Sequence, residues 1–158
     1  MSVASTSAPV ARGQGQRLSI QERLTITALS LCAIMLLSVA AWLQPASAGM
    51  GTHTQLGIPA CSWPATVGLP CPSCGMTTAF ALAADGRFFD SFLAQPMGFL
   101  LAVATAGFAV VSAYAALTGS RMLSAITDKI GGRFWWFFGA AILLSWGYKM
   151  LTLRGLIA

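Results

Sequence analysis

The amino-acid sequence predicts an all-α integral membrane protein with three transmembrane helices and a short interfacial helix. Of its 158 residues, 56% are hydrophobic and 8% are charged, whereas soluble domains carry roughly 25% charged residues. The mean hydropathy is +0.74, so an aqueous fold would have too few polar groups for its surface. Three long apolar runs, separated by polar or charged segments, supply the predicted spans.

The first apolar run covers residues 24–43 and contains no charged residue. A helix rises about 1.5 Å per residue, so this run matches a hydrocarbon core about 30 Å thick. Residues 1–23 precede it and are predicted to be a disordered cytoplasmic tail. The alternative is a signal peptide spanning 24–48, because Ala46-Ser47-Ala48 resembles a cleavage site. The run is longer than the roughly 7–15 residues of a signal-peptide core, which favours a retained helix.

The second and third apolar runs complete the predicted membrane domain, which covers residues 24–158. The second run covers residues 96–117 and begins with Pro96, which suits a first helical turn because its missing N–H would be unpaired there. The third covers residues 134–153 and holds Lys149 near its end, where a lysine side chain can extend to the lipid headgroups.

Residues 44–95 are predicted to form a loop that contains three of the four cysteines. Its first part is rich in Gly, Pro and Thr, which is typical of irregular structure. From Gly75 to residue 84 the pattern becomes helical, and Asp85-Gly86 would end the helix. This segment is the predicted interfacial helix.

Basic residues predict the orientation of the chain in the membrane. They flank the runs on one side of a three-helix topology, at Arg12, Arg17, Arg23, Arg121, Lys129 and Arg133. Positively charged flanks stay in the cytoplasm. We therefore expect a multi-pass cell-membrane protein with a cytoplasmic N-terminus and an outward-facing cysteine loop. The basic residues are too sparse for a nucleic-acid-binding face.

Small residues recur along the run at 96–117, which predicts a close helix–helix contact in lipid. They are Gly98, Ala102, Ala106, Ala109 and Ala113. Packing within the chain is the favoured explanation, with Gly139-Ala140-Ala141 of the third run as a matching surface. A homo-oligomer or contact with another membrane protein is the alternative, and the lipid bilayer is the expected partner in every case.

The residues with distinctive chemistry are Cys71-Pro72-Ser73-Cys74 and Cys61, ten positions upstream. Cys32 lies in the first run and is predicted to be a small buried hydrophobic residue. A disulfide between Cys61 and Cys71 or Cys74 is the favoured interpretation, because thiols oxidise outside the cytoplasm.

Two other interpretations of these cysteines stay open. His53, Cys61, Cys71 and Cys74 supply one nitrogen and three sulfurs, a ligand set that tetrahedral zinc accepts. Alternatively, Cys71 and Cys74 exchange disulfides, because a Cys-x-x-Cys pair at a helix N-terminus has a lowered thiol pKa. The βαβ pattern of a thioredoxin-like protein is absent, which weakens this third interpretation.

Thr77 and Thr78 follow the cysteine pair and also have two interpretations. Their hydroxyls can bond to helix carbonyls in an apolar setting. Alternatively, with Cys74 they line a shallow polar pocket at the membrane surface.

The Cys-Pro-x-Cys-Gly-x-Thr motif, with Gly86 and a polar residue–Pro pair after it, resembles a family of small bacterial membrane proteins catalogued as domain of unknown function 2752. The resemblance covers about residues 58–100. The family usually has Arg where this chain has Thr78, and Asn where it has Gln95. The resemblance implies a bacterial membrane protein, but it implies no particular activity. The matching residues are Cys61, Cys71, Pro72, Cys74, Gly75, Thr77, Gly86, Gln95 and Pro96.

These observations favour a non-enzymatic accessory or scaffold protein of the membrane, with a cysteine-stabilised extracytoplasmic loop and no cofactor. The alternative is a membrane-anchored thiol-redox or zinc-binding protein that uses Cys61, Cys71 and Cys74. The predicted spans contain no acidic residue, and ion-coupled transporters usually need ionisable groups there.

Overall fold

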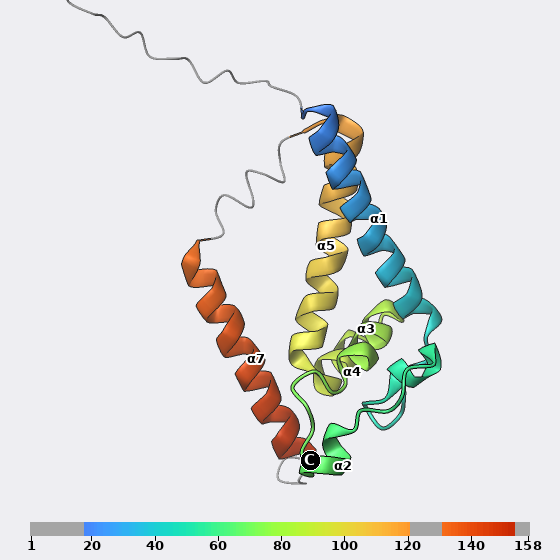
Figure 1. Cartoon of the computed structure of the whole chain (residues 1–158), viewed down its shortest axis with the longest axis vertical. Helices are drawn as coiled ribbons and strands as arrows, with labels where there is room; N and C mark the ends of the chain where they lie inside the picture. Colours follow the sequence, from blue (N-terminus) through green and yellow to red (C-terminus); the bar gives the residue numbers. More distant parts are fainter. Residues whose placement is uncertain (1–17, 121–130, 154–158) are drawn as a thin grey trace, which may run out of the picture.

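The computed structural model describes residues 18–120 and 131–153, and this part of the chain is helical without any β-strand (Figure 1). The all-α prediction is therefore confirmed. Residues 1–17 of the predicted tail lie outside the described residues. The elements are α1 (Ile20–Trp42), the 3-10 helix η1 (Thr52–Leu56), α2 (Trp63–Val67), α3 (Met76–Ala84), α4 (Phe88–Ala94), α5 (Pro96–Thr118) and α7 (Gly132–Leu153).

The first helix, α1, begins at Ile20 rather than at the predicted residue 24, because a capping box fixes its start. The Ser19 hydroxyl accepts a hydrogen bond from the Glu22 backbone N–H at 3.2 Å. The Glu22 carboxylate in turn accepts from the Ser19 N–H at 2.8 Å. Two helix-terminal donors are thus satisfied reciprocally. The last four residues of the predicted tail are helical as a result.

Two helices, α1 and α5, are long and apolar enough to cross a membrane, with mean hydropathies of 2.3 and 2.0. Only 17% and 22% of these apolar segments are buried within the chain, so most of their side chains face outward. The third predicted span, α7, does not meet the same criterion, because its tryptophans, Tyr148 and Lys149 lower its hydropathy. A third membrane span is therefore not confirmed.

The predicted small-residue face of α5 packs within the chain only in part, since Ala106 is exposed, and it contacts α1 and α3 rather than mainly α7. Ala33 and Ala40 of α1 are buried, as are Ala102 and Ala109 of α5. The Ser30 hydroxyl donates to the Ala109 carbonyl at 3.5 Å. Figure 1 shows α7 beside the first turns of α5 and well separated from it at the other end.

Close packing of α3 against α5 fixes the position of the cysteine motif, which precedes α3. A Cβ on Gly98 would lie 2.9 Å from Ala79 Cβ and 3.2 Å from Met76 Cα, so only glycine permits this approach. The Ser91 hydroxyl of α4 donates to the Ala79 carbonyl at 2.6 Å. These contacts hold the beginning of α3, and with it Cys74, against the first turn of α5.

Candidate functional site: a three-cysteine cluster

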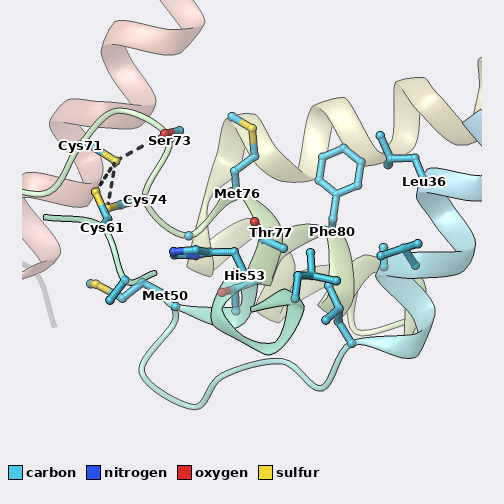
Figure 2. A pocket seen from close by; sticks show the side chains of 18 of the residues that line it. Leu36, Met50, His53, Cys61, Cys71, Ser73, Cys74, Met76, Thr77 and Phe80 are labelled. Atoms are coloured by element: carbon cyan, nitrogen blue, oxygen red, sulfur yellow. Dashed lines mark hydrogen bonds between the residues drawn. The ribbon is translucent and has the colours of Figure 1, made fainter. Parts of the chain in front are cut away.

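Three cysteine sulfurs converge in the loop before α3 (Figure 2). The Cys71 and Cys74 sulfurs lie 3.1 Å apart, and the Cys61 and Cys71 sulfurs lie 3.7 Å apart. All three lie within 4.8 Å of one another. A turn in which the Cys74 N–H donates to the Cys71 carbonyl at 3.0 Å brings the first two together.

The structure does not support the predicted disulfide of Cys61 with Cys71 or Cys74. All four cysteines are free thiols, and the sulfur–sulfur distances of 3.1 Å for Cys71–Cys74 and 3.7 Å for Cys61–Cys71 far exceed the bond length of about 2.05 Å. Three sulfurs surround a common point instead of forming one pair. The prediction for Cys32 is wrong as well, because this residue is exposed on α1.

The two thiols of the Cys-x-x-Cys pair have opposite pKa shifts. Burial tends to raise the pKa of Cys71, but hydrogen bonds with Ser73, Cys74 and Cys61 outweigh it and lower the pKa. Desolvation and the hydrogen bond with Cys71 raise the pKa of Cys74 to about 12. Cys71 is therefore the member of the pair that ionises first.

Lys149 lies buried beside the cysteine motif, with 5% of its surface exposed. Its ammonium group donates to the Ala94 carbonyl at 2.8 Å and to the Gly49 carbonyl at 3.2 Å. In residues 18–120 and 131–153, no carboxylate forms an ion pair with it, whereas Cys74 interacts with it electrostatically. The prediction that Lys149 extends to lipid headgroups is wrong. The sequence did contain a signal for this burial, because an isolated lysine in an apolar helix usually has a specific partner within the protein.

Gly75 is required by this arrangement. It adopts a φ of +91° as the residue before α3. A Cβ there would lie 2.7 Å from the Gly49 oxygen, 3.2 Å from the Lys149 ammonium and 3.4 Å from the Ala94 oxygen. The motif glycine therefore leaves room for the lysine and both of its acceptors.

Two other side chains at the same end of α7 donate hydrogen bonds, one to the loop before α3 and one to α4. The Trp146 indole N–H donates to the carbonyl of Pro70, the residue before Cys71, at 2.9 Å. The Tyr148 hydroxyl donates to the Leu93 carbonyl at 3.3 Å. With Lys149, these side chains attach α7 to the loops that precede α3 and to the last turn of α4.

The remaining motif residues have structural contacts. Thr78 is fully buried, and its hydroxyl lies 2.7 Å from that of Thr52 in η1. Gln95 is 1% exposed and donates through its Nε2 to the Pro72 carbonyl at 3.1 Å. Its Oε1 is buried with no hydrogen-bond partner among the described residues. Gln95 thus links the cysteine motif to Pro96, the first residue of α5.

A cavity of about 880 Å³ extends from the cluster along α1. Cys74, Thr77 and Thr78 are among its lining residues, but most of its lining is apolar. His53 also lines it (Figure 2) and yet is not part of the sulfur cluster. Of the four predicted zinc ligands, the structure therefore brings together the three cysteines and not the histidine.

Comparison with known proteins identifies this segment. Residues 61–109 match the profile of a family described as protein of unknown function (DUF2752), which confirms the resemblance seen in the sequence. The match begins at Cys61 and so includes all three cysteines of the cluster. No curated protein and no solved structure matches the chain.

Replacing Gly75 with alanine tests the role of the motif glycine. Alanine at a positive φ costs about 1–2 kcal/mol, and the contact with the Gly49 oxygen adds about 1–3 kcal/mol of overpacking. Gly51→Ala is the matched control, because Gly51 has a φ of +94° with no atom within 4 Å of the added Cβ. Thermal unfolding in detergent should show a clearly lower Tm for G75A than for G51A. Equal Tm values would contradict the close packing around Gly75.

Proposed function

We propose that this chain, with its DUF2752 segment, is a small multi-pass membrane protein that binds zinc through Cys61, Cys71 and Cys74. The convergence of three sulfurs from two parts of the loop carries the proposal. Zn–S bonds of about 2.3 Å in a tetrahedral site place the sulfurs about 3.8 Å apart. The Cys61–Cys71 separation of 3.7 Å already fits, and the 3.1 Å of Cys71–Cys74 must widen slightly.

The buried ammonium group of Lys149 would balance the charge of a zinc–thiolate centre. Three thiolates around a divalent ion leave one net negative charge, and buried charges need compensation. The Lys149 ammonium group, which interacts with Cys74, supplies one positive charge beside the cluster. A zinc–thiolate centre next to this lysine is therefore close to electrically neutral.

The role that follows for the ion is to hold the loop rather than to perform a reaction. Zinc would connect the Cys61 segment to the start of α3, which packs on α5. The loop would then present a fixed surface to other membrane proteins, which is the accessory or scaffold function expected from the sequence.

Thiol–disulfide exchange is a second candidate, favoured by the 3.1 Å between the Cys71 and Cys74 sulfurs at the start of α3. In this reaction the two thiols would form one disulfide and transfer two electrons and two protons to a partner protein's disulfide, which becomes two thiols. A bound metal would block both sulfurs, so the two candidates are distinguishable.

Metal analysis distinguishes these functions. We expect one zinc per chain in protein purified without chelator, and at least ~10-fold weaker zinc binding after Cys61→Ser, Cys71→Ser or Cys74→Ser. Cys32→Ser is the control and should bind normally, because Cys32 lies outside the cluster. Metal-free protein with a Cys71–Cys74 disulfide, or insulin reduction by the isolated chain, would favour the redox candidate instead.

The proposal also places α7 as a third span and the cluster on the extracytoplasmic side, in accordance with the basic flanks of the first two spans. A membrane-impermeant maleimide tests this placement in intact cells that carry Cys32→Ser. Cys71 should become labelled once an external chelator has removed the zinc. Labelling that occurs only after the membrane is permeabilised would contradict the orientation.

A further inference from the structure

Cys71 contacts both of the other sulfurs in the cluster. Its sulfur lies 3.1 Å from that of Cys74 and 3.7 Å from that of Cys61. The turn that contains Cys71 and Cys74 is closed by a hydrogen bond between their backbones. A disulfide between these two residues therefore requires their sulfurs to approach by only about 1 Å, because the S–S bond length is about 2.05 Å.

The three thiols differ in accessibility. Cys61 and Cys71 are half-buried, whereas Cys74 is buried. All three line the cavity beside α1 (Figure 2), so a small neutral oxidant that enters this cavity reaches the Cys71 sulfur. Zinc binding keeps its cysteine ligands as thiolates, and exposed thiolates are the cysteines most easily oxidised. Of the two accessible sulfurs, that of Cys71 has the nearer second sulfur, so oxidation starts there and Cys74 reacts next.

The cluster contains no ligand that oxidation would spare. Among the described residues, the group of potential metal ligands consists of Cys61, Cys71 and Cys74, without a histidine or a carboxylate. The thiolate is the form of cysteine that binds metals, and a disulfide sulfur carries no such charge. A disulfide between two of these residues would leave zinc with one protein ligand, whereas zinc sites use three or four.

We infer that the cluster is a redox-controlled zinc site, in which a hydroperoxide converts Cys71 and Cys74 into a disulfide and thereby releases the ion. This inference rests on the proposed zinc site and describes its regulation.

The reaction balances with hydrogen peroxide as the oxidant. The Cys71 thiolate attacks one peroxide oxygen, so that an S–O bond forms, the O–O bond breaks and hydroxide leaves. The Cys74 thiolate then attacks the Cys71 sulfur, which forms the S–S bond, breaks the S–O bond and releases a second hydroxide. Solvent protons convert both hydroxides to water. Two thiolates have then lost two electrons to the peroxide, and Cys61 takes a third proton as zinc leaves.

Zinc release would change the surface of the loop. In the zinc form, the ion connects the Cys61 segment to the start of α3. In the oxidised form, the disulfide lies within one turn, and Cys61 is no longer connected to it. The surface that zinc holds for other membrane proteins is therefore present only while the cysteines are reduced. Exchange with an external dithiol, which becomes a disulfide itself, restores the thiols and the site.

Stoichiometric oxidation of the zinc-loaded chain tests this inference. The full chain with Cys32→Ser is purified in detergent under a reductant, loaded with zinc, freed of reductant and treated with one molar equivalent of hydrogen peroxide. We expect release of the bound zinc to a chromogenic chelator, loss of two of the three remaining thiols, and a Cys71–Cys74 disulfide in peptide maps. Dithiothreitol should restore all three thiols and zinc binding.

Two variants test the central position of Cys71. In the same background, Cys61→Ser and Cys71→Ser each remove one zinc ligand and keep two thiols, so they are matched in metal ligands and in oxidisable groups. Cys61→Ser retains the two sulfurs that lie 3.1 Å apart. We expect peroxide to form an intramolecular disulfide at least ~10-fold faster in C61S than in C71S. Equal rates would contradict the assigned order of oxidation.

The possible failures are separable. If the chain, reduced beforehand, binds no zinc, the proposed function is wrong and the inference fails with it. If zinc binds but remains bound after one equivalent of peroxide, only the inference is overturned. Oxidation to sulfinic acid without a disulfide, a disulfide between two copies of the chain, or zinc that does not rebind after reduction would also overturn it.

Discussion

The rest of this structure depends on the hydrogen bonds that the buried ammonium group of Lys149 donates. Removing a charge from water is costly unless it is paired or hydrogen-bonded. Two backbone carbonyls, from Gly49 and Ala94, accept its hydrogen bonds, and these residues lie on opposite sides of the cysteine motif in the sequence. One side chain of α7 therefore holds together the loop after α1 and the junction of α4 with α5.

The form of the motif follows from this interaction. Gly75 lacks a side chain because the lysine and its acceptors occupy the space where a Cβ would project. Cys74 precedes it and is buried beside the same positive charge. Burial and the hydrogen bond with Cys71 nevertheless raise the pKa of Cys74 to about 12, so this thiol stays protonated unless a metal ion displaces its proton. Lys149, Gly75 and Cys74 are thus packed together at the start of α3.

Local signals in the sequence predicted the elements that depend on neighbouring residues. Pro96 marks the start of α5, and Asp85-Gly86 correctly end α3, because caps and breakers act within one helical turn. The start of α1 was missed, although Ser19 and Glu22 have the capping-box spacing that marks a helix beginning at Ile20. The Cys71–Cys74 contact is local in the same sense, because only Pro72 and Ser73 lie between the two cysteines.

Contacts between distant residues were not predictable from the same signals. Lys149 meets Gly49 across a separation of 100 residues, and nothing near either residue indicates the other. The favoured disulfide assumed that oxidised cysteines pair, whereas here a third sulfur joins the first two. His53 was included for its chemistry alone, and its position on η1 leaves it outside the cluster.

The zinc affinity of a Lys149→Met variant is the most direct test of this account. Methionine keeps most of the side-chain volume but removes the charge and both hydrogen bonds, while all three cysteines remain. We predict that chelator competition will give a Kd at least ~10-fold weaker than that of the natural chain, as for other residues that support metal ligands. Tyr148→Phe, which removes only the 3.3 Å bond to Leu93, should change the Kd by less than ~2-fold. An unchanged Kd for K149M would contradict the claim that the buried lysine organises the site.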